Sequence, residues 1–166
     1  MPYWRPEKDR PCFDFRKHDV TVTDEVWKFF RDIRHIEQLG EKLDIGIKVV
    51  AEQFDHANRA SYLGSVIAHI RNSRRPLLVF LDPDTGLEPK HCDVKHTTAK
   101  EIQGTWGELR QGDWLVLYQH ARHKPQWTRT VSRQLRILCG GAGVEIARSD
   151  RVGKDVAFMC IERRVD

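Results

Sequence analysis

An apolar run that ends in two aspartates constrains the fold of this chain more than any other feature. Residues 77–81 read Leu-Leu-Val-Phe-Leu and lead directly into Asp-Pro-Asp-Thr-Gly at 82–86. An unbroken apolar run bounded by turn residues predicts a strand buried on both faces, which indicates a parallel sheet. In open α/β sheets ligands bind outside the carboxyl ends of the strands, so we expect Asp82 and Asp84 at the functional edge.

Helical and strand patterns alternate along the rest of the chain. The spacing of apolar residues, caps and turn residues predicts helices at 24–39, 57–72, 98–109 and 125–138, and further strands at 45–51, 114–118, 144–147 and 156–161. The last two strands are joined by a connection too short for a parallel crossover, so they form an antiparallel hairpin. The order predicts a single α/β, Rossmann-like domain over residues 23–166, with a predominantly parallel sheet flanked by helices.

The bulk properties narrow the function classes only mildly. A length of 166 residues is that of one domain, and the formal net charge of +4 permits an anionic partner such as nucleic acid. No apolar run approaches the roughly 20 residues that span a bilayer, so we expect no membrane insertion. Residues 1–6 contain no apolar signal-peptide core, and we therefore expect a cytoplasmic protein.

The first 22 residues differ in kind from the rest. Proline and aromatic residues recur there: Pro2, Tyr3, Trp4, Pro6, Pro11, Phe13 and Phe15. This composition predicts an extended arm over residues 1–22 that is ordered by packing rather than by secondary structure. The cover is expected to be the domain itself or a second subunit, and we expect a homodimer because a shortened Rossmann core leaves an apolar edge.

Three residues are the candidate catalytic group. Asp82 and Asp84 follow one predicted strand and His120 ends the next, so adjacent strands would bring them together. Hard carboxylate oxygens suit a divalent metal such as Mg²⁺ or Mn²⁺, and a carboxylate beside an imidazole also suits general acid–base chemistry. The alternatives are structural: Asp-Pro-Asp-x-Gly is good turn chemistry, and His120 could cap the next helix.

Basic residues follow His120. Two of them, Arg122 and Lys124, precede the predicted helix at 125–138, and two more, Arg129 and Arg133, lie on one of its faces. All four could contact nucleic-acid phosphates. A solvated charged face is the alternative for the same four residues.

The order of elements over about residues 44–163 resembles the C-terminal half of class I S-adenosylmethionine-dependent methyltransferases. In that family a strand ending in Asp-Pro-Pro-Tyr or a relative carries the reacting site, and residues 82–85 here read Asp-Pro-Asp-Thr. The resemblance implies S-adenosylmethionine as cofactor and a sheet with residues 77–82 central, beside 113–119. It also implies that the final strand inserts between 113–119 and 144–147.

The chain departs from that family at two points. No Gly-rich turn is present to let the backbone approach the cofactor, and Gly46 lies inside a predicted strand rather than after one. Thr85 stands in place of the aromatic residue that stacks on the target base. We therefore expect weak binding of S-adenosylmethionine.

A second similarity is to uncharacterised bacterial and phage proteins. These pair a Leu-Asp-Pro-Asp-[Asn/Thr]-Gly-Leu segment, here residues 81–87, with a later Tyr-Gln-His, here residues 118–120. Members carry further sequence upstream of the position of Tyr3, so this similarity predicts a chain truncated at its N-terminus. No activity comes with the similarity.

Three functions therefore remain open. The first is a methyltransferase-like domain acting on nucleic acid. The second is a metal-dependent nuclease or phosphoesterase that uses Asp82, Asp84 and His120. The third is a non-catalytic binding or assembly module.

Overall fold

The structure is a computed structural model of the chain. It describes residues 12–21, 23, 36–50, 55, 57–89, 93, 95–121, 126–148 and 155–164. In chain order the elements are β1 (Cys12–Phe15), β2 (His18–Thr21), α2 (Ile36–Leu43), α3 (Arg59–Asn72), β3 (Leu78–Leu81), β4 (Gly86–Leu87), β5 (His96–Thr97), α4 (Ala99–Glu108), β6 (Trp114–His120), α5 (Trp127–Leu138), β7 (Val144–Ala147) and β8 (Val156–Glu162). The protein is therefore a mixed α/β structure, as the alternating patterns predict.

The main sheet has four strands in the order β3-β6-β8-β7. The final strand β8 lies between β6 and β7 and is antiparallel to both, so the predicted insertion is confirmed. The prediction of a predominantly parallel sheet is wrong for this sheet, because only its β3–β6 pairing is parallel, whereas β6–β8 and β8–β7 are antiparallel. The short β7–β8 connection reverses β8, and its insertion makes both of its pairings antiparallel.

The strand predicted at 45–51 does not form over its described residues, since 45–50 have no regular structure. The chain instead turns back along α2: the Ile45 amide donates to the Gly40 carbonyl at 2.9 Å, and the Val49 amide donates to the Glu37 carboxylate at 2.9 Å. Gly40 is buried and a Cβ there would collide with the Ile45 carbonyl, so glycine allows this close return. Among the described strands, β3 is consequently an edge strand rather than the predicted central one.

The predicted N-terminal elements are only partly described. Residues 12–21 of the predicted arm form the β1–β2 hairpin, so the expectation of packing without secondary structure is wrong there. The Phe15 ring lies edge-on to Trp114 with centroids 6.5 Å apart, which places the hairpin against the start of β6. Residues 1–11 and 22, and positions 24–35 of the predicted helix, lie outside the described residues.

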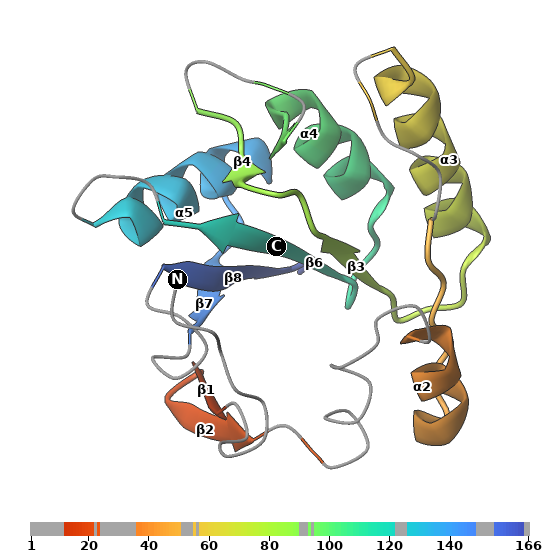
Figure 1. Cartoon of the computed structure of the whole chain (residues 1–166), viewed down its shortest axis with the longest axis horizontal. Coiled ribbons are helices and arrows are strands. Elements are labelled where there is room, and N and C mark those ends of the chain that lie inside the picture. The colour runs from red at the N-terminus through yellow and green to blue at the C-terminus, as the bar shows by residue number, and fades with distance from the viewer. Residues whose placement is uncertain are drawn as a thin grey trace.

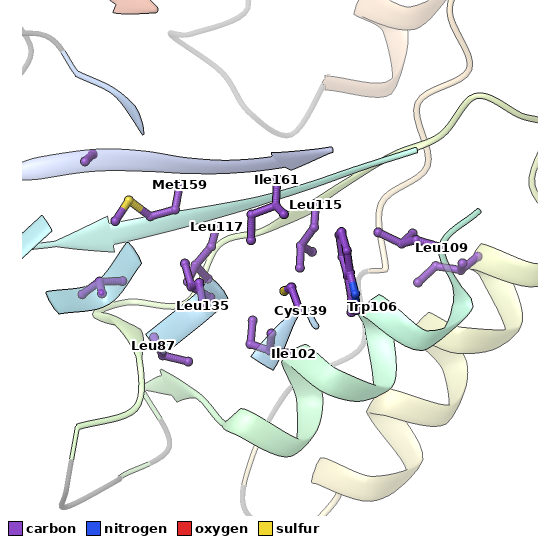
Figure 2. Packing of buried hydrophobic residues seen from close by; sticks show 13 residues of the cluster. Leu87, Ile102, Trp106, Leu109, Leu115, Leu117, Leu135, Cys139, Met159 and Ile161 are labelled. Atoms are coloured by element: carbon purple, nitrogen blue, oxygen red, sulfur yellow. The ribbon is translucent and has the colours of Figure 1, made fainter. Parts of the chain in front are cut away.

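Helices cover one face of the sheet. Figure 1 shows α3, α4 and α5 above the strands, with the β1–β2 hairpin and α2 below them. The hydrophobic core lies between the sheet and α4 and α5, as Figure 2 shows for Ile102, Leu117 and Leu135, all of which are fully buried. Reciprocal hydrogen bonds between Thr98 and Glu101 form a capping box at the start of α4.

The opposite face of the sheet is much more open at β3. The Leu78 and Phe80 side chains are 59% and 48% exposed, so the prediction of a strand buried on both faces is wrong. Strand residues alternate between faces, and only Val79 and Leu81 pack against the core beneath the helices. An apolar run shows that a strand can be buried, but it does not supply the second covering layer.

A buried ion pair fixes the other end of these strands. The fully buried Asp113 carboxylate accepts hydrogen bonds from the Arg75 guanidinium, from the Leu77 amide at 2.8 Å and from the Arg110 amide at 2.7 Å. Since Leu77 precedes β3 and Asp113 precedes β6, this carboxylate holds the amino ends of the two parallel strands together. Their carboxyl ends are thereby set side by side at the opposite edge.

Candidate functional site

The structure brings the predicted catalytic residues to one edge of the sheet. β3 ends at Leu81, which pairs with Leu117, and β6 continues to His120, whose amide donates to the Thr85 carbonyl at 3.4 Å, so the residues after β3 run beside the end of β6. Burial and the negative charge of Asp84 raise the pKa of Asp82, whereas the charge of His120 lowers it. Asp82 is therefore within electrostatic reach of both Asp84 and His120.

Tyr118 belongs to the same group, although it was not among the predicted site residues. Its hydroxyl lies 3.2 Å from His120 Nε2, and the two rings meet edge-to-face with centroids 5.0 Å apart. Burial raises the pKa of Tyr118, and the negative charges of Asp82 and Asp155 raise it further, so the phenol stays protonated at neutral pH. The signal was present in the sequence, because residues two apart on a strand share a face.

Aromatic rings form a row beside Asp82 on the open face of the sheet. The Phe80 and Phe158 centroids are 6.0 Å apart, and Phe158 lies 5.7 Å from Tyr118, which in turn contacts His120. We call these four residues the aromatic row. The row lies over the neighbouring strands β3, β6 and β8 and offers ring surface to a planar ligand, with Asp82 two residues after Phe80 at its β3 end.

Gln119 points to the opposite face and links the two sequence motifs. Its amide is 1% exposed: Oε1 accepts from the Leu87 amide at 2.9 Å, and Nε2 donates to the Thr85 and His120 carbonyls at 3.0 and 2.8 Å. Gly86 passes so close that a Cβ would collide with this amide, and its φ of +104° also favours glycine. Gln119 therefore fixes the loop that follows Asp82 and Asp84.

The described residues do not form a ready metal site. Within the parts of the chain that the structure describes, no three His, Cys, Asp or Glu side chains are placed to hold a metal ion. Asp82 and Asp84 thus remain two carboxylates without an assembled set of further ligands.

The predicted basic residues divide into two groups. Arg129 and Arg133 lie on α5 and are exposed, whereas Arg122 and Lys124 lie outside the described residues.

Of the helices that the structure describes, none combines the length and apolarity that crossing a membrane requires.

Comparisons of the chain with protein-family models, with curated proteins and with solved structures give no match.

Proposed function

We propose that the chain is a methyltransferase-like α/β domain that recognises an amino-bearing base of nucleic acid at Asp82. The observation that carries this proposal is the aromatic row, which ends beside the Asp82 carboxylate at the carboxyl edge of the parallel pair β3–β6. The strand order supports it, since β8 is inserted as in the family that the sequence resembles.

The chemistry of the site suits such a base. A carboxylate accepts hydrogen bonds only, so it selects a donor such as an exocyclic amine. In the methyltransferases that the sequence resembles, an aromatic residue at the position of Thr85 stacks on the target base. Here the exposed Phe80 ring supplies a stacking surface instead. His120 and Tyr118 complete the site as groups that can exchange a proton with a bound amine.

The described residues do not fit the usual cradle for S-adenosylmethionine. That cradle needs a Gly-rich turn after a strand, but residues 45–50 form no strand and a Cβ on Gly46 would meet no atom within 4 Å. The proposed recognition therefore involves only the substrate half of the site, where the base binds.

Calorimetric titration with adenosine and with purine riboside tests the proposal. The two ligands stack alike, but only adenosine carries the amine, and a hydrogen bond to a charged group is worth roughly 1.5–3 kcal/mol. We expect adenosine to bind at least tenfold more tightly, and Asp82→Ala to abolish this preference. Asp84→Ala is the matched comparison, because it removes the same charge two residues along and should leave the preference intact.

Equal binding of the two ligands by the wild-type protein would refute the proposal. Retained preference in Asp82→Ala would place the acceptor elsewhere. Phe80→Ala should weaken both ligands equally, because stacking does not depend on the amine. Mn²⁺-dependent cleavage of an oligonucleotide that Asp82→Ala abolishes would favour the nuclease alternative instead.

A further inference from the structure

We propose that the exposed arginines of α5 bind the phosphates of a single nucleic-acid strand. We call Arg129, Arg133 and Arg136 the arginine face. The inference rests on the proposed function for the identity of the polymer, and it assigns the strand a second contact surface beyond the base at Asp82.

The three side chains share one side of the helix. Residues three and four apart are neighbours on a helix surface, and Val131 and Leu135 occupy the opposite, buried side. At a rise of 1.5 Å per residue, Arg133 lies about 6 Å along the axis from Arg129 and about 4.5 Å from Arg136. These steps are comparable with the distance between neighbouring phosphates of a nucleic-acid strand, so adjacent arginines are spaced to contact successive phosphates.

Two members of the arginine face, Arg129 and Arg133, are unfavourable for the helix itself. The third, Arg136, lies in the last turn, where the dipole favours a cation, and its Nε donates to the Gly141 carbonyl at 3.1 Å. The positive end of the helix dipole lies in the first turn, where Arg129 is placed, and like charges four residues apart repel. The α5 sequence contains no aspartate or glutamate. Among the residues that the structure describes, Arg129 and Arg133 have no side-chain hydrogen bond or ion pair. An anionic partner would offset the positive charge that Arg129 and Arg133 carry.

The arginine face lies near the base site but on the other side of the sheet. The helix α5 follows β6, whose last residue is His120, so its first turn lies at the same edge of the sheet as Asp82. Because α5 covers one face and the aromatic row lies on the open face, the bound strand would pass around this edge to contact both. The Arg148 guanidinium lies 6.0 Å from the Trp127 ring centroid at the helix start. Asp82 and Asp84 would repel a phosphate, so the charges place a base at the aspartates and the phosphates at α5.

Fluorescence anisotropy of a labelled 12-nucleotide single-stranded DNA at several salt concentrations tests the inference. In Arg129→Gln/Arg133→Gln we expect at least tenfold weaker binding. The slope of log affinity against log salt should fall in magnitude by about 1.4, at about 0.7 for each phosphate that is no longer neutralised. Glutamine is a good helix former, so circular dichroism should show the fold unchanged. The matched control is Arg74→Gln, since Arg74 is exposed and precedes β3 at the opposite edge.

The inference is overturned if the double variant keeps the wild-type affinity and salt slope, or if Arg74→Gln weakens binding equally. It is also overturned if polyglutamate of similar charge displaces the DNA as well as unlabelled DNA does, because the surface would then select charge alone. Asp82→Ala separates this inference from the proposed function. The Asp82→Ala variant should still bind the labelled DNA strand, even though it has lost the preference for an amino-bearing base.

Discussion

Replacing Gln119 with leucine should strongly destabilise the protein, because one buried amide holds the loop 85–87 against the end of β6. The leucine side chain has similar volume but makes none of the three hydrogen bonds. Leaving the Leu87 amide without this acceptor costs about 1–3 kcal/mol, and each of the other two bonds contributes about 0.5–1.5 kcal/mol. The apolar surface of leucine offsets part of that loss. We expect a net loss of about 3 kcal/mol in the free energy of unfolding.

Urea unfolding measures this loss directly, as a lower midpoint with an unchanged slope. For a chain of this length the same loss lowers the melting temperature by roughly 6–12 °C. Hydrogen exchange at the Leu87 amide gives the local readout and should accelerate more than exchange in β8. A loss below about 0.5 kcal/mol, with the Leu87 amide still protected, would refute the role assigned to Gln119.

Gln119→Glu provides a control with a pH signature. The carboxylate keeps an acceptor for the Leu87 amide but faces the Thr85 and His120 carbonyls with oxygen instead of a donor. Burial and this repulsion should raise the pKa of the introduced carboxyl group in the folded protein above its unfolded value of about 4.3. The destabilisation should therefore be largest well above the folded pKa and shrink as the pH falls towards about 4. A pH-independent loss would contradict this account.

A double-mutant cycle with Gly86→Ala tests the contact between the two motifs. In the wild-type background the new methyl group meets the Gln119 amide and the backbone keeps an unfavourable positive φ. In a Gln119→Ala background only the φ penalty remains, so the second substitution should cost less. A coupling energy near zero would show that the loop does not depend on this contact.

Three further predictions concern charge, cofactor and thiols. Because folding raises the pKa of Asp82, its negative charge opposes folding above the unfolded pKa of about 3.9. Asp82→Asn should therefore raise the free energy of unfolding by about 0.5 kcal/mol at about pH 7 and leave it unchanged at about pH 3, as measured by urea unfolding. S-adenosylmethionine should bind only weakly, because the described residues and the sequence contain no Gly-rich cradle for it; micromolar or tighter binding by calorimetry would contradict this inference. Burial raises the pKa of Cys139 to about 12 and that of Cys160 to about 11, so neither thiol should react with an alkylating reagent at about pH 8 until the protein unfolds.

The sequence predicts best those elements whose signals are local. The capping box at Thr98 and Glu101, the alternation along β6 and the short β7–β8 connection each determine structure within a few residues. The strand prediction for 45–50 is wrong because the apolar residues of this segment suit a strand as well as they suit the irregular segment that is observed. Its course is determined by the close return onto Gly40, which is a tertiary contact.

The sequence likewise predicts the parts of the candidate site that depend on strand ends, but not those that depend on tertiary contacts. The positions of Asp82 and His120 follow from strand ends and from parallel pairing, which the sequence indicates. Neither the contact of Phe80 with Phe158 nor the exposure of Phe80 can be read from the sequence. The first depends on where β8 inserts, and the second depends on which face of the sheet the helices cover.

The side chains of the Tyr-Gln-His motif lie on both faces of β6 and have different roles on each. Because side chains alternate along a strand, Tyr118 and His120 lie on the open face with the aromatic row, while Gln119 is buried on the helix face and holds the loop after Asp82. A shift of one residue in the register of β6 would exchange these roles and bury the imidazole. Substitutions at 118 or 120 should therefore alter ligand binding with little loss of stability, whereas substitutions at 119 should do the reverse.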